Sequence, residues 1–257
     1  MPKITSKDGT TIAYDKKGQG PTLILVLGAL NKRGSGKKLT DLLSDRFTII
    51  SYDRRGRGDS TDMQPYSTDK EVEDIEALID ELGGSAYLYG HSSGAVLALM
   101  AAKKLVGKVK GVALYELPYN TDPAAQSAAE AYRSELQKLL AEDKRGDAVA
   151  LFVKSVGVTD KQVEAMKRLP MWKGLTAMAP TLAYDTIELM EEYLSVDARD
   201  VEARTLVMYG GASPAFMGET AHELSETLPH ATLRALEGQT HDVKAEVLAP
   251  VLAEFFA

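Results

Sequence analysis

The sequence predicts an α/β fold, in which a mostly parallel β-sheet has helices on both faces and carries a helical insertion. Three observations support this prediction. Short runs typical of strands alternate with helical stretches along most of the 257-residue chain. Several of these runs are apolar throughout, as in strands that are buried on both faces of a parallel sheet. One segment, residues 120–200, breaks the alternation and shows no convincing strand.

The individual elements follow from local patterns. Runs rich in β-branched, aromatic and leucine residues predict strands at residues 10–18, 22–28, 47–53, 86–90, 111–116, 205–210 and 231–238. Helical patterns between them predict helices at residues 68–82, 93–104, 216–228 and 244–256. The segment without strands carries apolar stripes at helical spacing, such as Tyr132, Leu136 and Leu139. We therefore expect a core made of residues 1–118 and 201–257, with a helical cap at residues 119–200.

Composition restricts the classes of function. The chain is 44% apolar and 26% charged, which is ordinary for a globular protein that buries a sizeable core. It has no Cys, which excludes disulfides, thiolate metal ligands and a Cys nucleophile. Its net charge of −7 disfavours nucleic acid and anionic membranes as partners. The start lacks an apolar signal region and no apolar run approaches the roughly 20 residues of a membrane span, so we expect a cytoplasmic protein.

The motif with the clearest chemistry is Gly90-x-Ser92-x-Gly94. It follows a predicted strand and opens a predicted helix, which is the context of a nucleophile elbow. In that turn the serine hydroxyl projects from a tight bend, and the helix N-terminus stabilises negative charge. The alternative interpretation is an inert serine in a glycine-rich turn.

With this elbow, the sequence resembles the α/β-hydrolase superfamily over nearly its whole length. Two further stretches carry the resemblance: SYDRRGRGDS, at residues 51–60, and LEGQTHDV, at residues 236–243. They are similar to the family's loop after the strand preceding the elbow and to its late histidine loop. The insertion that follows Glu116 lies where the family places its lid. The resemblance implies a hydrolase in which the nucleophile, the cap and the histidine follow one another in this order.

A serine nucleophile needs a base near neutral pH, and we expect that base to be His241. The resemblance places the base on the loop after the last strand, where His241 lies. Of the other histidines, His91 belongs to the elbow and is interpreted as packing, whereas His222 and His230 are expected to be exposed. A lone histidine is more often structural than catalytic, so the order and context of His241 carry this assignment.

Two backbone N–H groups are expected to form the oxyanion hole. One belongs to Ser93, directly after the nucleophile, and the resemblance assigns the other to Ala29, on the loop after an earlier strand. Many family members have His-Gly before this position, whereas this chain has Leu27-Gly28. Because the donor is a backbone group, this departure changes how the loop is braced and does not remove the donor.

The resemblance also implies a third catalytic residue, an acid that orients His241 and completes a Ser-His-acid triad. At the position where the family usually carries this acid, the sequence has no carboxylate. The turn after the strand at residues 205–210 carries Ser213, whose neutral hydroxyl cannot stabilise an imidazolium. We expect Glu116 to be the acid, because it ends the strand before the cap, where some members of the superfamily carry it. A cap-hinge or substrate-contacting role for Glu116 is the alternative. Less suitably placed carboxylates are Asp242, Glu237 and Glu219.

Two basic stretches receive structural interpretations. One is expected to be a solvated turn, since it fails the pattern of a phosphate-binding loop, and contains Lys32, Arg33, Lys37 and Lys38. The other is expected to be a salt-bridged loop that braces the core, with a phosphate or carboxylate site as the alternative, and contains Asp53, Arg54, Arg55, Arg57 and Asp59.

The sequence thus predicts a serine hydrolase without cofactor or metal that cleaves a small carboxylic ester, thioester or lactone through an acyl-enzyme. Met171, Trp172 and Met178 are expected to line the site for an apolar acyl or alcohol group, with ordinary cap core as the alternative. We expect a monomer or homodimer. Two other functions remain open: perhydrolase, C–C hydrolase, lyase or cofactor-free dioxygenase chemistry on the same triad, and a noncatalytic small-ligand receptor.

Overall fold

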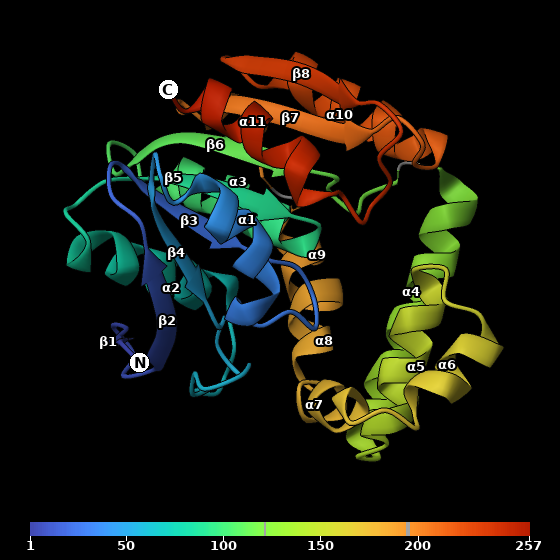
Figure 1. The fold of residues 1–257 in the computed structure, drawn as a ribbon. Coiled ribbons are helices and arrows are strands. Elements are labelled where there is room, and N and C mark those ends of the chain that lie inside the picture. The colour runs from blue at the N-terminus through green and yellow to red at the C-terminus, as the bar shows by residue number, and fades with distance from the viewer. Residues whose placement is uncertain (121, 194–195) are drawn as a thin grey trace.

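An eight-stranded sheet forms the centre of the molecule, in a computed structural model that describes residues 1–120, 122–193 and 196–257 (Figure 1). Its strands are β1 (Lys3–Thr5), β2 (Thr11–Lys17), β3 (Thr22–Val26), β4 (Thr48–Tyr52), β5 (Ala86–His91), β6 (Val109–Tyr115), β7 (Arg204–Gly210) and β8 (Ala231–Leu236). They follow the order β1-β2-β4-β3-β5-β6-β7-β8. The pairings β1–β2 and β2–β4 are antiparallel and all others are parallel. The predicted α/β class is confirmed.

Helices cover both faces of the sheet, and five of them pack directly on it: α1 (Lys37–Leu43), α2 (Thr68–Glu81), α3 (Ser93–Lys104), α10 (Ala215–Thr227) and α11 (Ala245–Phe255). Side chains of a strand alternate between the faces. In β3, Leu23 and Leu25 join the apolar cluster that contains α1 and α11. Ile24 and Val26 join the cluster that contains α2, α3 and α10. The sheet is therefore the middle of three layers.

The start of the core contains elements that the sequence analysis did not predict. Strand β1 and helix α1 are both additional, and a 3-10 turn, η1 (Arg33–Gly36), precedes α1. The interpretation of Lys32, Arg33, Lys37 and Lys38 as a solvated turn is wrong in part. Lys37 begins α1, and Leu39 and Leu43 on that helix are buried in the core. Arg33 pairs with three carboxylates, those of Asp15, Asp53 and Asp59.

Between β6 and β7 the described residues form helices and no strand. These are α4 (Pro123–Ala141), α5 (Arg145–Ser155), α6 (Asp160–Met166), α7 (Met171–Ala177), α8 (Thr181–Ala183), the π-helix η2 (Tyr184–Glu188), α9 (Leu189–Tyr193) and the 3-10 turn η3 (Ala198–Asp200). Helices α4, α5 and α6 extend away from the sheet, whereas α8 and α9 lead back to it (Figure 1). This segment has an apolar cluster of its own, centred on Leu136, Val149 and Leu182.

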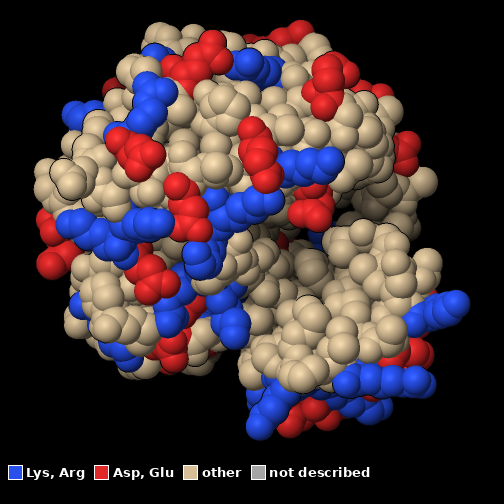
Figure 2. Space-filling view, viewed as in Figure 1, with Lys and Arg blue, Asp and Glu red and all other residues tan. Residues whose placement is uncertain are grey.

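Two contacts join the helical segment to the sheet. Leu189 of α9 is buried in the same cluster as α3, and Ala29 and Leu30, after β3, pack against the cluster of the helical segment. In the space-filling view, a hollow separates the outer part of the helical segment from the core (Figure 2). We propose that the chain divides into a core at 1–118 and 201–257 and a cap at 119–200.

Candidate active site

Ser92 lies on a tight turn between β5 and α3. Its backbone has φ 56° and ψ −128°, a strained conformation that points to a constrained position. Close packing enforces the turn: a Cβ on Gly90 would lie 2.5 Å from Ala95 Cα, and one on Gly94 would lie 2.1 Å from the Val26 carbonyl oxygen. Both glycines are required because other residues would collide with backbone. The predicted strand–turn–helix context of the motif is present.

Glu116 and His241 meet at the ends of β6 and β8. Glu116 directly follows β6 in a left-handed conformation, with φ 50°, and His241 lies on the loop after β8. The His241 Nδ1–H donates a hydrogen bond of 2.7 Å to Glu116 Oε2. The Glu116 side chain is 0% exposed and that of His241 is 38% exposed. With Nδ1 protonated, a neutral His241 presents Nε2 as a proton acceptor.

The other oxygen of Glu116 is also bound. Its Oε1 accepts 2.8 Å from the Gly210 N–H and 2.5 Å from the Ser213 hydroxyl. Burial would raise the pKa of Glu116, but the hydrogen bonds from His241, Ser213 and Gly210 hold that pKa below its ordinary value. The carboxylate is therefore ionised at neutral pH. Ser213, at the usual acid position, serves as a hydrogen-bond donor to the acid.

Among the described residues, the other candidate carboxylates form no hydrogen bond with the His241 ring. In the described part of the chain, the imidazole hydrogen bond of His241 goes to Glu116 and to none of Asp242, Glu237 or Glu219. Glu237 follows β8 and Glu219 lies within α10. Of the five positions considered in the sequence, Glu116 is the one whose geometry fits an acid.

Residues at the ends of β5 and β6 form hydrogen bonds with the loop that carries His241. The Tyr115 hydroxyl donates 2.6 Å to the Thr240 carbonyl, and His91 Nε2 lies 2.9 Å from the His241 carbonyl. The rings of His91 and His241 have centroids 4.8 Å apart. Burial and the neighbouring His241 lower the pKa of His91 to about 4, so His91 is neutral and its Nε2–H is the donor. His91 is a packing residue, as predicted, but its partner is the loop of His241.

The loop after β3 passes close to Ser92. A Cβ on Gly28 would lie 3.0 Å from Ser92 Cβ, so Ala29 follows at a point of close approach. Its N–H has no acceptor among the described residues, and that of Ser93 opens α3, where N–H groups have no intrahelical acceptor. The Asn31 side-chain amide braces the loop with a 3.1 Å hydrogen bond to the Ala29 carbonyl.

The structure does not join every member of the predicted site. Ser92 Oγ makes no hydrogen bond with the described residues, so the serine–histidine hydrogen bond is not formed here. In proteins without bound substrate such bonds are often long and tighten only when the substrate is present. Ser92 is nevertheless tied to the same corner, because its N–H donates 3.0 Å to the carbonyl of Tyr115, the residue before Glu116.

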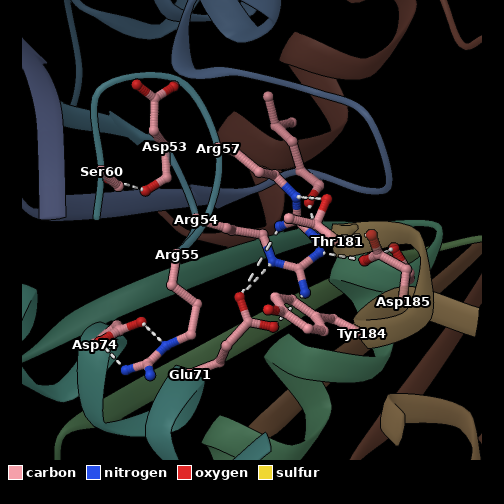
Figure 3. Close-up of polar contacts among 12 residues, drawn as sticks. Asp53, Arg54, Arg55, Arg57, Ser60, Glu71, Asp74, Thr181, Tyr184 and Asp185 are labelled. Carbon is pink, nitrogen blue, oxygen red and sulfur yellow. Dashed lines mark hydrogen bonds and ion pairs between the residues drawn. The ribbon is translucent and has the colours of Figure 1, made fainter. Parts of the chain in front are cut away.

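A buried ionic network that was only partly expected from the sequence includes Arg54, Arg57, Glu71 and Asp185 (Figure 3). It reaches the elbow through a 2.8 Å hydrogen bond from the Ser93 hydroxyl to Asp185. Arg54 donates two hydrogen bonds to Glu71 of α2, at 3.0 and 2.5 Å, and one of 2.6 Å to Asp185 of η2. Arg57 donates 2.6 Å to the other oxygen of Asp185. The arginines thus have carboxylates of the chain as partners, which favours the bracing interpretation over an external anion site. Asp185, 131 residues from Arg54, was not predicted.

The predicted substrate residues of the cap lie in different surroundings. Met171 is 52% exposed, whereas Met178 is 4% exposed. Trp172 borders an open cavity of about 760 Å³ on the cap, together with Asp147 and Lys173. Neither Ser92 nor His241 borders this cavity, so it is not the site of the proposed chemistry.

The described residues offer neither a metal site nor a membrane span. Within 1–120, 122–193 and 196–257, no group of three or more His, Asp or Glu side chains is placed to hold a metal ion. Over the same ranges, no helix combines the length and the apolar composition that crossing a membrane requires.

Comparison with known proteins matches residues 30–250 to the model of the alpha/beta hydrolase family. The chain is similar to a 2-(acetamidomethylene)succinate hydrolase from Mesorhizobium japonicum, with 26% identity over 95% of this chain and 91% of that protein. A solved alpha/beta hydrolase from Sphaerobacter thermophilus is 43% identical over 100% of both chains, with a TM-score of 0.88. A solved hydrolase from Pseudomonas aeruginosa is 20% identical over 100% of this chain and 98% of that one, with a TM-score of 0.80. The match over most of its length, together with the fold, shows that this chain belongs to the alpha/beta hydrolase family.

Proposed function

We propose that the protein is a cofactor-free serine hydrolase that cleaves a carboxylic ester, thioester or lactone through an acyl-enzyme. The observation that carries the proposal is the 2.7 Å hydrogen bond from His241 to the buried Glu116, next to Ser92 on its strained turn. The Ser92 N–H donates to the carbonyl of Tyr115, the residue before the ionised Glu116, which supports a serine beside the histidine–carboxylate pair. This arrangement supplies a nucleophile, a base and an orienting charge.

In the first half of the reaction, Ser92 Oγ attacks the carbonyl carbon while His241 Nε2 takes the hydroxyl proton. The new Oγ–C bond converts the carbonyl oxygen into an oxyanion, which the N–H groups of Ala29 and Ser93 stabilise. When the intermediate collapses, the bond to the leaving group breaks and His241 passes the proton to the departing oxygen or sulfur. The alcohol or thiol leaves, or in a lactone becomes a free hydroxyl on the acyl chain, and the acyl group remains on Ser92.

In the second half, water replaces the leaving group. His241 removes a proton from the water as its oxygen attacks the acyl carbon, and the same two N–H groups hold the second oxyanion. Collapse then breaks the Oγ–C bond, His241 returns the proton to Ser92 and the carboxylic acid leaves. Glu116 stays ionised throughout and stabilises the imidazolium that forms twice per cycle.

A serine at the elbow also separates this proposal from halide or epoxide displacement. Related enzymes for those reactions use a carboxylate nucleophile, whose ester water can cleave. Ser92 cannot form that type of ester with an alkyl substrate, because attack on an epoxide or alkyl halide would leave a stable ether. Acyl transfer is the chemistry that a serine can complete.

Hydrolysis of an amide is a second candidate, favoured by one comparison. The relative from Mesorhizobium japonicum, which covers 95% of this chain, is named for 2-(acetamidomethylene)succinate, a compound with an acetamido group. The same steps apply to it, with His241 passing the proton to nitrogen instead of oxygen. An acetamide substrate therefore belongs in the substrate panel beside the esters.

Substrate choice is assigned to the cap. We propose that Met171, Trp172 and Met178 line the space for an apolar acyl or alcohol group, with the largest effect expected for the buried Met178. Met178→Ala should then change the order of preference in a panel of p-nitrophenyl esters of rising chain length. Met171→Ala, at a position 52% exposed on the same cap segment, should change the order less. An unchanged order in both variants would contradict this assignment.

We also propose that the protein is cytoplasmic and acts on small molecules as a monomer or homodimer. The acidic composition, with a net charge of −7, supports the absence of nucleic acid and anionic membrane as partners. Size-exclusion chromatography with light scattering measures the oligomeric state directly.

The main test is labelling with a fluorophosphonate probe and turnover of p-nitrophenyl esters, each in the wild type and in Ser92→Ala. We expect rapid labelling at Ser92 and ester turnover in the wild type, and neither in the variant. Residual turnover above about one part in 10³ would contradict the acyl-enzyme mechanism. Labelling without turnover of any ester or amide would support other chemistry on the same triad. An unlabelled wild type would support a ligand receptor.

A further inference from the structure

Four groups form a hydrogen-bonded chain from one side of the oxyanion hole to the other. Arg54 Nη1 donates to the Leu27 carbonyl, at 3.4 Å, and to Asp185 Oδ1, at 2.6 Å. The same Asp185 oxygen accepts 2.8 Å from the Ser93 hydroxyl. Leu27 lies two residues before Ala29, and Ser93 carries the other proposed donor. One guanidinium nitrogen and one carboxylate oxygen therefore connect the two halves of the hole.

Both connecting side chains are fixed by further partners. Arg54 is held by the two hydrogen bonds to Glu71, and Glu71 also accepts 2.9 Å from the Tyr66 hydroxyl. Asp185 Oδ2 is held by Arg57. Burial would raise the pKa of Asp185, but Arg57 and Arg54 lower it, so the carboxylate is charged. A buried charge with several fixed partners has little freedom to move.

We propose that Asp185 is a positioning residue: together with Arg54 it fixes the spacing between the Ala29 and Ser93 N–H groups that bind the oxyanion. This inference rests on the proposed function, because it assumes that these two groups hold an oxyanion. It also gives the π-helix η2 a role, since this turn of the cap delivers Asp185 to the elbow.

Misplaced oxyanion donors should weaken binding of the transition state more than binding of the substrate. Oxyanion donors act at about 2.7–3.1 Å from the developing charge, and losing one donor costs about 10²–10³ in kcat. A misplacement of about 1 Å costs up to about 10²-fold. The neutral carbonyl of the bound substrate depends less on these donors. Loss of Asp185 should therefore lower kcat more than it changes KM.

The first experiment compares Asp185→Asn with Asp74→Asn in the ester assay. Asp74 is a matched control: it is a buried carboxylate that accepts two hydrogen bonds from Arg55, at 2.8 and 2.7 Å. Among the described residues, it forms no hydrogen bond with the elbow. Both variants should have a lower Tm. Asp185→Asn should lose at least about tenfold in kcat with KM within about threefold, whereas Asp74→Asn should keep kcat within about twofold.

A second readout separates misplacement from a general loss of folded enzyme. A trifluoromethyl ketone matched to the best ester forms a tetrahedral adduct with Ser92 and needs the same oxyanion donors. In Asp185→Asn its Ki should rise in proportion to the fall in kcat/KM, with active enzyme counted by fluorophosphonate labelling. A Ki equal to that of the wild type would overturn the proposal, as would equal losses of kcat in Asp185→Asn and Asp74→Asn.

Ser93→Ala decides the matter if Asp185→Asn does not fold. It removes the hydroxyl that reaches Asp185 and keeps the backbone donor and the ion pairs. We expect a loss of kcat of about threefold or more and, where both can be measured, a smaller loss in the double variant than the product of the single losses. Full kcat in Ser93→Ala would overturn the proposal. Turnover that persists in Ser92→Ala would instead overturn the proposed function, so the two failures are distinguishable.

Discussion

Ser213 donates a 2.5 Å hydrogen bond to Oε1 of Glu116, the carboxylate whose Oε2 accepts from His241. The turn after β7 and the end of β6 therefore meet at one carboxyl group. β6 and β7 are parallel neighbours, which places both residues at the same edge of the sheet. Ser213 occupies the position that usually carries the acid, and in this chain it donates a hydrogen bond to the proposed acid, Glu116.

Replacing Glu116 by Gln should lower kcat by about 10²–10⁴ while KM changes little. The amide has no charge to stabilise an imidazolium, and it presents an N–H where the His241 Nδ1–H needs an acceptor; the corresponding Asp→Asn change in the serine-protease triad costs about 10⁴. Steady-state kinetics on the best ester measures both constants. Full activity in Glu116→Gln would remove this residue from the triad.

Adding Ser213→Asp to Glu116→Gln should restore part of the lost kcat. The new carboxylate would lie beside the amide and return a negative charge to the same corner. Ser213→Asp alone should change kcat little, because His241 already has Glu116 as its partner. A Glu116 that only contacted substrate would not be replaced from this turn. Absence of any rescue, in a double variant that folds, would count against the triad assignment.

The stability contribution of Glu116 should disappear in acid. Because its folded-state pKa is held below the ordinary value, the contribution is fully present above the unfolded-state pKa of about 4.3 and is lost as the pH falls through the folded-state value. Below about pH 4.3, the difference in unfolding free energy between the wild type and Glu116→Gln should therefore shrink with each step down in pH. Urea titrations at several acid pH values measure it. A difference that stays constant or grows over this range would contradict the prediction.

Gly94→Ala should destabilise the elbow strongly. Its Cβ would lie 2.1 Å from the Val26 carbonyl oxygen, so β3 or α3 must shift, at a cost of about 1–3 kcal/mol or more. Gly34→Ala is the control, because no atom lies within 4 Å of its added Cβ. Urea unfolding should show a loss for Gly94→Ala alone, with a parallel loss of ester turnover. Equal stabilities would mean that the helix and the strand are not in contact as described.

Tyr115→Phe should release the loop of His241. It removes the 2.6 Å hydrogen bond to the Thr240 carbonyl, which is worth about 0.5–1.5 kcal/mol of stability, and should lower kcat several-fold through a less fixed imidazole. Tyr89→Phe is the control on the neighbouring strand, since the Tyr89 hydroxyl makes no hydrogen bond with a described residue. Equal kcat values for the two variants would show that the brace has no effect on the base.

The sequence allowed the sheet, most of the flanking helices and the elbow to be predicted, for local reasons. Apolar runs mark the buried strands, and a serine between two glycines at a strand–helix junction is typical of a nucleophile elbow. The boundaries of α3 agree with those expected. Strand β1 has three residues and α1 is a short helix whose first residues are basic, so neither produces a long periodic pattern.

The side-chain partnerships across the site were harder to predict. That Glu116 binds both His241 and Ser213 depends on how β6, β7 and β8 lie in register. The sequence indicated Glu116 by elimination and by resemblance, and it contained no sign that Ser213 would assist. Asp185 was missed for a similar reason: its arginine partners lie in a loop more than 120 residues away, and its π-helix looks like ordinary helix in the sequence.

The shared carboxyl group between β6 and β7 bears on how such enzymes diversify. A lineage that moves its acid from one strand to the other need not pass through an inactive ancestor, because an intermediate with acids at both positions 116 and 213 retains a partner for His241. A hydroxyl at position 213 is compatible with an acid at position 116, because Ser213 in this chain donates a hydrogen bond to Glu116. Directed evolution can follow the same route in either direction while Ser92 and His241 stay fixed.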